Sequence, residues 1–452
     1  MGDSITEIGH GRKRTNEEKP KKFPLITYPC LILLTNTMNS DILIIGGGII
    51  GVSTAYALAR EEVSVTLVEK GEICDGSSHG NAGMICPCHS TPIPGPGVLW
   101  QGIKWMFNPV SPFYIRPRFD PELIAWLWQF RRFCNEEAYH RAISPLREMQ
   151  RASIGLFQEW IAQEKMDCDF EKIGGLELFL TREKYEAGRH HVEEMRRFGL
   201  DMEWLDRDAT HALEPAARPE VIGGIHYKED AHLNPAKFVH RLAEAAKRQG
   251  AKILTQTQVL GFECKGQKVK TMWTSQGDFQ PEQVVLAAGT WSAVILRALG
   301  IHLPLQAAKG YSITLKRPAI SPRIPLHLAE ARMAVTPMGA VLRYAGTLEL
   351  SGISTTINER RVNAIRRGAA RYLVDSSPRE EVEVWAGMRP VAPDGLPYIG
   401  RVRALSNLIV ATGHAMLGVS MGPVTGKVVG EIVREVKPSL DLGAFGVERF
   451  AR

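Results

Sequence analysis

The stretch DILIIGGGIIGVSTAYALAREEVSVTLVEK, residues 41–70, decides the fold of this chain. Its apolar run Ile42–Ile45 predicts a buried strand, Val52–Arg60 has the composition of a helix, and Val63–Val68 predicts a second strand. A strand, a helix and a strand in this order form a βαβ unit, in which the two strands run parallel. We therefore expect an α/β fold built on a parallel sheet.

Three glycines follow the first strand in the pattern G-x-G-x-x-G. Gly46 permits a tight turn, Gly48 lets the backbone approach a pyrophosphate, and Gly51 lets the helix pack closely on the strand. The helix start offers unpaired N–H groups and a positive dipole end to phosphates. Glu69, eighteen residues after Gly51, is placed to accept hydrogen bonds from a ribose. The unit predicts a dinucleotide site without deciding which dinucleotide; the alternative is a βαβ unit whose turn binds nothing.

Length and composition limit the class of protein. The chain has 452 residues, more than one typical core, so two domains are expected. Hydrophobic residues make up 44% and charged residues 23%, as in ordinary globular proteins. The net charge of +6 is spread along the chain rather than gathered in blocks, which gives little support to nucleic-acid binding.

The chain has seven cysteines, an odd number scattered along its length, and this does not resemble a disulfide framework. Cys86 and Cys88 are too closely spaced for the usual zinc pattern and have no second pair beside them. We therefore expect reduced thiols, a cytoplasmic location and no metal site.

The first 37 residues need a separate interpretation. Residues 1–22 are polar and charged, and the apolar run 23–34 is interrupted by two prolines and is too short to span a bilayer. No small-residue cleavage site follows it, which disfavours a signal peptide. Met38 directly precedes the first strand and would be a natural start. We expect residues 1–37 to be a disordered or artefactually translated extension.

Hydrophobic periodicity predicts the remaining elements. Expected helices are 123–133, most of 140–200, 235–249, 357–373 and 423–436; expected strands are 175–180, those within 252–262, 283–288 and 407–414, and an antiparallel sheet over 305–350. Elements of the dinucleotide-binding type thus occur at the start, middle and end, so the domains are discontinuous. We expect a dinucleotide-binding domain of residues 38–110, 215–300 and 388–440, and a substrate domain of residues 111–214 and 301–387.

The expected helix 123–133, LIAWLWQFRRF, is apolar on most of its surface. Burial between the domains is the favoured interpretation. The alternative is an interfacial helix that touches lipid, with Arg131 and Arg132 at its edge.

Eight separate stretches resemble the flavin-dependent D-amino acid oxidoreductases, and most closely the bacterial D-amino acid dehydrogenases, with glycine oxidase and sarcosine oxidase as more distant relatives. The stretches are SDILIIGGGIIGVSTAYALA, SSHGNAGM, DAHLNPAKFV, VVLAAGTWS, KGYSITL, YAGTLELSG, GMRPVAPDGLPYIG and TGHAMLGVSMGPVTGK. They occur in the family's order, and the resemblance covers about residues 38–440.

The resemblance implies FAD in a Rossmann-type domain, with its flavin ring at the junction of the two domains and no covalent link, because no obvious cysteine for attachment is present. It places the Val259 backbone at the adenine, and the turn His414–Gly418 at the flavin N1–C2=O edge, where N–H groups suit developing negative charge. The residues implied at the cofactor are Gly46, Gly48, Ile49, Ile50, Gly51, Glu69, Lys70, Ser77, Ser78, Asn81, Ala82, Gly83, Val259, Gly289, Trp291, Arg389, Gly413, His414, Leu417 and Gly418.

Recognition of an α-carboxylate requires a cation, ideally a bidentate arginine. We favour Arg343, on the alternating sheet expected to form the pocket floor; its alternative is a solvated strand residue. Arg389 is expected to lie close to the flavin or to brace its loop. Tyr311 could donate to the carboxylate or only pack. His79 and His414 could lie near the flavin ring as catalytic groups or as hydrogen-bonded polar residues.

The implied reaction is oxidative deamination of a D-amino acid by hydride transfer from Cα to flavin N5, followed by hydrolysis of the imine to a 2-oxo acid and ammonia. Electrons would pass to a respiratory quinone or to oxygen, and peripheral membrane contact at the inner face would fit a quinone. One alternative is a secondary-amine oxidoreductase acting on D-hydroxyproline, D-proline, sarcosine or glycine. Others are a flavin-carrying subunit of a larger complex and a nicotinamide-dependent dehydrogenase.

Overall fold

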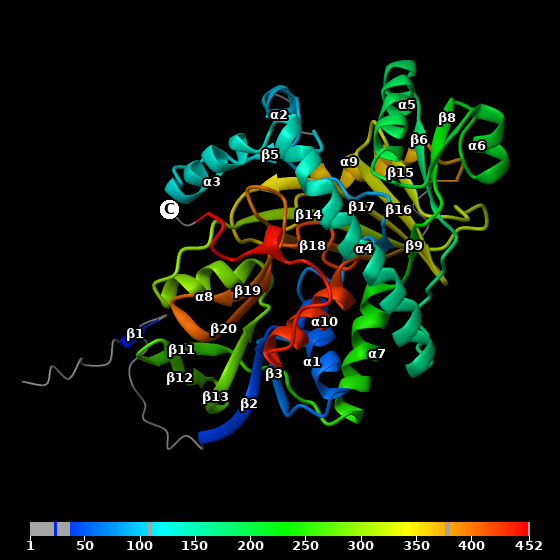
Figure 1. Ribbon diagram of the computed structural model, residues 1–452. Helices are drawn as coiled ribbons and strands as arrows, with labels where there is room; N and C mark the ends of the chain where they lie inside the picture. The colour runs from blue at the N-terminus through cyan, green and yellow to red at the C-terminus, as the bar shows by residue number, and fades with distance from the viewer. Residues whose placement is uncertain (1–21, 25–36, 107–110, 376–379, 451–452) are drawn as a thin grey trace, which may run out of the picture.

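The computed structural model describes residues 22–24, 37–106, 111–375 and 380–450. Within these residues the chain forms two nine-stranded sheets and a two-stranded ribbon, β4 (Met84–Ile85) with β9 (Ala231–His232). Figure 1 shows the first sheet in the lower half of the molecule and the second in the upper half. The expected α/β fold with a second, largely antiparallel sheet is confirmed.

The first sheet contains the parallel strands expected from the sequence. In spatial order they are β10 (Lys252–Leu254), β3 (Val65–Val68), β2 (Thr37–Ile45), β13 (Gly277–Leu286) and β20 (Leu405–Thr412). Antiparallel strands extend it: β11 (Val259–Lys265), β12 (Lys268–Thr274), β19 (Tyr398–Val402) and β1 (Lys22–Pro24). The register pairs Ile42 with Val65 and Ile45 with Val68, so the carboxyl ends of β2 and β3 meet at one edge.

Three helices cover one face of the first sheet: α1 (Ile49–Ala59), α7 (Pro235–Arg248) and α10 (Gly422–Val433). Figure 1 shows them side by side, next to β3. Helix α10 approaches α1 closely because Gly426 lacks a side chain; a Cβ there would lie 2.4 Å from the backbone of Ser53. The α8 helix (Ser292–Ala298) buries Leu296 in the hydrophobic cluster on the other face.

The second sheet lies over the carboxyl ends of the parallel strands of the first sheet. Its strands, in spatial order, are β18 (Glu381–Val391), β14 (Gln306–Lys316), β17 (Val341–Leu350), β16 (Met333–Met338), β15 (Leu326–Leu328), β6 (Gly175–Phe179), β8 (Gly223–Tyr227) and β7 (Met202–Leu205), with β5 (Phe113–Ile115) beside β17. Helices α5 (Arg182–Arg196), α6 (Arg207–Leu213) and α9 (Glu359–Ala370) pack on it. The antiparallel pairing expected over 305–350 is confirmed for β14, β16 and β17.

Helix α3 (Pro121–Arg132) is buried on one side only. Leu123, Trp126 and Phe130 belong to a hydrophobic cluster with residues of α2 (Val98–Met106), whereas Trp128 is 61% exposed. The expected burial therefore holds for one face of the helix, and the other face is open. Among the described helices, none combines the length and the apolar character that crossing a bilayer requires.

The expected domain boundaries differ from the observed packing in three places, and one of them is the end of β18, where residues 388–391 pair with β14 in the second sheet. Strand β8 lies within residues 215–300 but pairs with β6 in the second sheet. Helix α4 (Glu136–Glu164) lies within 111–214 but packs on α10, and its Trp160 ring contacts the Tyr56 ring of α1 at 4.9 Å. These differences have one cause: each element packs on the hydrophobic face that it covers, and the local sequence does not specify which face that is. Of residues 1–37, only Lys22–Pro24 and Thr37 are described; the remainder of this expected extension lies outside the described residues.

Candidate functional site

A cavity of about 2390 Å³ is lined by residues of both sheets. It begins at the glycine-rich turn after β2 and reaches β14, β17 and β18 of the second sheet. Of the residues expected at the cofactor, those that line the cavity are Gly46, Gly48, Ile49, Ile50, Glu69, Lys70, Ser77, Ser78, Asn81, Ala82, Val259, Gly289, Trp291, Arg389, His414, Leu417 and Gly418.

Three glycines of the expected cofactor set lie behind the cavity wall instead. A Cβ on Gly51 would lie 1.9 Å from the carbonyl oxygen of Gly46, and one on Gly83 would lie 2.2 Å from that of Leu233. Gly413 has φ +84° and its missing side chain faces the Tyr398 ring. These glycines shape the backbone that carries the site, because each allows a close approach that a side chain would block.

The turn after β2 is built for close backbone approach. Gly46 has φ +115°, and a Cβ there would lie 2.5 Å from the carbonyl oxygen of Ala287 on the neighbouring strand. Helix α1 begins after Gly48 without a side-chain cap and without an acidic residue in its first turn. The Ser78 hydroxyl accepts the Ile49 N–H at 3.0 Å. A buried, positively polarised helix start with small residues around it suits a pyrophosphate.

Glu69 closes one end of this turn. Its carboxylate accepts hydrogen bonds from the backbone N–H groups of Gly47 at 2.6 Å and Gly71 at 3.0 Å. Beside it the Lys70 ammonium lies 3.5 Å from the centre of the Trp291 ring, a cation–π contact at the same end of the cavity. The cavity, the glycine cradle and the acid at the strand end together fit FAD, and Glu69 lies where the sequence predicts a ribose-binding acid.

Replacing Glu69 with alanine is expected to weaken FAD binding by about 10–100-fold, because a hydrogen bond to a charged group contributes about 1.5–3 kcal/mol. Fluorescence titration of the apoprotein with FAD measures this change. Glu72→Ala is the matched control, since that neighbouring carboxylate pairs with the Gln256 side chain in an exposed position. Equal FAD affinity in the Glu69→Ala and Glu72→Ala variants would contradict the assignment.

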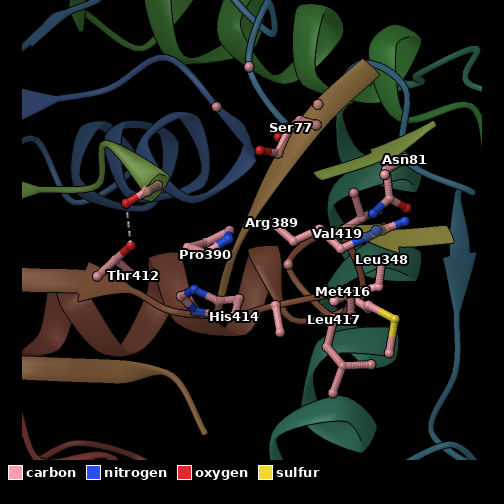
Figure 2. A pocket seen from close by; sticks show the side chains of 18 of the residues that line it. Ser77, Asn81, Leu348, Arg389, Pro390, Thr412, His414, Met416, Leu417 and Val419 are labelled. Atoms are coloured by element: carbon pink, nitrogen blue, oxygen red, sulfur yellow. Dashed lines mark hydrogen bonds between the residues drawn. The ribbon is translucent and has the colours of Figure 1, made fainter. Parts of the chain in front are cut away.

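At the far end of the cavity, two hydroxyl groups hold the strand that carries Arg389. Ser77 Oγ and Thr290 Oγ1 both donate to the carbonyl oxygen of Met388, the latter at 3.2 Å. Thr412 Oγ1 donates to the Gly289 carbonyl at 2.9 Å, which joins the ends of two strands of the first sheet. Figure 2 shows Ser77, Thr412 and Arg389 around this part of the cavity.

Arg389 is the arginine at this end of the cavity. It lines the cavity, and its Nη1 donates to the Thr347 carbonyl at 2.8 Å. A Cβ on Gly310 would lie 2.1 Å from the guanidinium, so the glycine of β14 makes room for this side chain. No carboxylate among the described residues pairs with it, and burial lowers the pKa of Arg389 to about 10. The cavity thus contains a fixed cation without a counter-charge.

Of the four expected catalytic residues, Tyr311 and His414 line the cavity, whereas Arg343 and His79 do not. The Arg343 guanidinium donates to Thr314 Oγ1 at 3.1 Å and to the carbonyl oxygens of His79 and Asn81 at 2.8 and 2.9 Å. It braces the loop that follows β3 from behind. The His79 ring pairs with the Glu383 carboxylate at 2.9 Å in a half-exposed position. Of the two arginines considered from the sequence, Arg389 lines the cavity, whereas neither Arg343 nor His79 does.

Tyr311 lines the cavity, but its hydroxyl is already engaged. It donates to Glu349 Oε2 at 3.1 Å, and burial together with that carboxylate raises the pKa of Tyr311. Lys309 Nζ lies 3.6 Å from Glu349 Oε1, and Arg361 Nε lies 3.1 Å from its other oxygen. The Tyr311 ring therefore packs as part of the cavity wall, and its phenol belongs to a buried ion network.

His414 lines the cavity and is neutral at physiological pH. Its Nε2 lies 3.0 Å from the Thr425 hydroxyl, and burial lowers the pKa of His414 to about 3. A folded-state pKa below the unfolded value of about 6.5 means that the unfolded chain binds the proton first as pH falls. The stability due to this neutral histidine is complete above pH 6.5 and decreases toward the folded pKa.

We therefore expect acid to destabilise the folded protein, with His414 contributing a slope of about 1.4 kcal/mol per pH unit between pH 6.5 and 4. His414→Gln should reduce the pH slope by about that amount, whatever its effect on absolute stability. Denaturant unfolding with saturating FAD at several pH values measures both slopes. Identical slopes in the wild type and the variant would contradict a buried neutral His414.

Several cavity residues were not identified from the sequence. Thr257 and Trp273 lie at the Val259 end, and Leu348 lies near Arg389. Trp385 lies under the loop after β3, where a Cβ on Gly80 would lie 2.0 Å from its ring. Leu348 falls within the stretch YAGTLELSG, which could have indicated its place in the cavity.

A further group on the cavity wall includes Cys86, His89, Glu177, Tyr227 and His327. No local pattern in the sequence identified them, because they come from four distant segments.

Comparison with known proteins agrees with this geometry. A family model described as FAD dependent oxidoreductase matches residues 41–432. D-amino acid dehydrogenase 1 of Mesorhizobium japonicum is 32% identical over 422 residues, covering 91% of this chain and 100% of the relative. D-amino acid dehydrogenase of Granulibacter bethesdensis is 29% identical over 419 residues, covering 91% and 99%.

Two solved structures share the fold. Glycine oxidase from Geobacillus kaustophilus has a TM-score of 0.72 at 23% identity and covers 91% of this chain and 99% of its own. L-proline dehydrogenase from P. horikoshii has a TM-score of 0.71 at 21% identity and covers 92% and 98%. The family match, the relatives and the cavity converge: this chain belongs to the FAD-dependent oxidoreductases and is an enzyme of that family.

Proposed function

We propose that this enzyme oxidises D-amino acids to 2-oxo acids and ammonia. The observation that carries the proposal is Arg389, a half-buried arginine that lines the cavity and has no carboxylate partner among the described residues. An α-carboxylate is the anion whose two oxygens match a guanidinium fork. The D configuration is supported by relatives that match nine-tenths of the chain and are named D-amino acid dehydrogenases.

Arg389 fixes the position of the substrate. The Thr347 carbonyl holds one of its Nη atoms, and the Met388 carbonyl before it is held by two hydroxyl groups, so the guanidinium is oriented before substrate arrives. A fixed carboxylate restricts the positions that the attached Cα can take. The residues described above would hold FAD without a covalent link, and FAD would supply the redox chemistry that takes up the hydride of the Cα–H bond and leaves an imine. Water then adds to the resulting imine and releases ammonia.

No side chain is needed as a base in this scheme. The positive charge of Arg389 lowers the pKa of a nearby substrate ammonium, which favours entry of the neutral amine. Neutral His414 adds no charge, and the Tyr311 phenol is committed to Glu349. Leu348 and Leu417 line the same part of the cavity and exclude water from the reacting carbon. The chain thus binds, orients and desolvates, and the cofactor supplies the redox chemistry.

We further propose that electrons pass to a respiratory quinone at the cytoplasmic face of the membrane. Large apolar side chains are exposed on and beside α2 and α3: Trp100 is 73% exposed, Phe119 90% and Trp128 61%. Arg131 lies over the Trp128 ring at 5.2 Å, which places a cation beside this apolar surface. Aromatic residues with adjacent basic groups are typical of contact with an anionic lipid surface.

A substrate panel tests the proposed reaction. Purified enzyme is mixed with D- and L-alanine, D- and L-proline, sarcosine and glycine, with a dye as artificial acceptor, and 2-oxo acid and ammonia are measured. We expect turnover of D-alanine with ammonia and pyruvate in equal amounts. Turnover of the L-enantiomers at equal rates, or of the secondary amines alone without ammonia release, would contradict it. Faster reoxidation by a soluble quinone than by oxygen is expected, and the reverse order would contradict the proposed acceptor.

A further inference from the structure

A second group of reactive side chains lies in the cavity wall under the second sheet. Cys86 follows β4, Asp230 lies in the turn between β8 and β9, and His327 lies on β15. One ligand atom from each of these three residues lies within 4.8 Å of the other two. The fold therefore brings a thiol, a carboxylate and an imidazole together from three distant segments of the chain.

Two polar atoms of this group lack hydrogen-bond partners in the described part of the chain, while Asp230 Oδ1 accepts the Cys88 backbone N–H at 3.1 Å. Asp230 Oδ2 and His327 Nε2 are buried and have no hydrogen-bond partner among the described residues. The Asp230 side chain is only 3% exposed, and no described lysine or arginine forms an ion pair with it. His89 Nε2 is also unpartnered and lies 3.8 Å from Asp230 Oδ2. A buried carboxylate without a counter-charge is costly, so this arrangement calls for a cation or a proton.

The donor set indicates which cation. A thiolate, an imidazole nitrogen and a carboxylate oxygen are the ligands that Zn²⁺ takes in proteins, at about 2.3 Å for sulfur and about 2.0–2.2 Å for nitrogen and oxygen. Calcium and magnesium prefer oxygen donors alone. One Zn²⁺ would neutralise the charges of the Cys86 thiolate and Asp230 together, leaving the buried site without net charge.

We propose that Cys86, Asp230 and His327 bind one Zn²⁺, with the fourth coordination position beside His89 at the cavity wall. Cys86 and His327 both line the cavity, so an ion has a route of entry. Glu177 and Tyr227, hydrogen-bonded to each other at 2.6 Å, lie next to this group and pack against His89 through the Tyr227 ring at 4.1 Å. The ion ties together the side chains of three segments, two of which are already joined by the pairing of β4 with β9.

The zinc content of the FAD-loaded enzyme tests this site. The protein is dialysed against micromolar free Zn²⁺, passed through a desalting column and analysed for metal by mass spectrometry. We expect one zinc ion per chain in the wild type and a large loss of zinc in Cys86→Ser and His327→Gln. Cys264→Ser is the control, because this free cysteine lies on β11 of the first sheet, away from the group. That variant should keep its zinc.

X-ray absorption spectroscopy at the zinc edge of the wild type measures the zinc–ligand distances and needs no variant. We expect one sulfur ligand at about 2.3 Å with nitrogen or oxygen ligands at about 2.0 Å. The proposal is overturned if the wild type retains no zinc above the buffer level, if its zinc shows no sulfur ligand, or if the Cys86→Ser variant, folded and yellow, binds as much zinc as the wild type. Each of these results leaves the proposed oxidation of D-amino acids unaffected.

Discussion

Replacing Arg389 with lysine is expected to lower kcat/KM for D-alanine by about 100-fold, and replacing it with alanine by about 10³-fold. Lysine keeps a positive charge but loses the planar fork that binds both carboxylate oxygens. Alanine removes the charge as well, leaving a buried substrate carboxylate unpaired. Because the carboxylate contact is the same before and during Cα–H cleavage, most of the loss should appear in KM. Steady-state kinetics on FAD-saturated enzyme measure both constants.

Arg343→Lys is the control for this result. Its guanidinium also lies in the second sheet but donates to Thr314 and to the loop carbonyls of His79 and Asn81. We expect this variant to bind FAD less tightly and to unfold at a lower temperature, with KM for D-alanine unchanged once FAD is saturating. A raised KM in Arg343→Lys together with an unchanged KM in Arg389→Lys would mean that Arg343, and not Arg389, binds the substrate carboxylate.

Gly51→Ala is expected to raise the dissociation constant for FAD by about 100-fold and to destabilise the fold by about 3 kcal/mol. The new Cβ would lie 1.9 Å from the Gly46 carbonyl oxygen, which is backbone and cannot rotate away. Gly46 cannot move away from the new methyl group either, because the Ala287 carbonyl lies against its α-carbon. Helix α1 must therefore move off the strand and take the phosphate-binding turn with it. The FAD content after gel filtration and the unfolding temperature report the two effects.

Gly155→Ala provides the matched control. Gly155 also lies within a helix, α4, but a Cβ there meets no atom within 4 Å. Alanine is a better helix former than glycine, so this variant should be unchanged or more stable by about 0.5–1 kcal/mol, with full FAD content. Similar losses in both variants would mean that the effect of Gly51→Ala is not due to the helix–strand contact.

The first sheet could be predicted from the sequence because its constraints are local. The features that identify this unit all lie within thirty residues of one another: the strand Ile42–Ile45, the turn glycines and Glu69. The structure places them as expected. The loop with Ser77 and the turn ending at Gly418 were identified through their resemblance to known stretches, and both line the cavity.

The choice of arginine could not be predicted, because it depends on register. Arg343 and Arg389 lie on the two strands that flank β14, opposite Thr314 and Ala308 respectively. The hydroxyl of Thr314 accepts from Arg343 and helps direct it behind the loop, whereas Gly310 leaves room for the Arg389 guanidinium. A glycine inside a strand often marks a close approach by another group, but Gly310 alone does not say which side chain approaches it.

The Cys86, Asp230 and His327 group was beyond sequence reasoning for a related reason. Local spacing gave Cys86 only Cys88 as a neighbour, and that thiol points to the Asp201 carbonyl. The other two residues reach Cys86 through the pairing of β4 with β9 and of β6 with both β8 and β15. Contacts that depend on two sheets meeting carry no periodic or spacing signal in the chain.

Anaerobic mixing of the yellow enzyme with one amino acid at a time tests the central claim most directly. The claim is that a D-amino acid, held by its carboxylate on Arg389, delivers two electrons to the bound flavin. We predict complete loss of the flavin absorbance near its visible maximum with D-alanine, no loss with L-alanine on the same timescale, and a markedly slower loss with D-alanine in Arg389→Lys. Equal bleaching by both enantiomers, or no bleaching by any D-amino acid, would contradict the account.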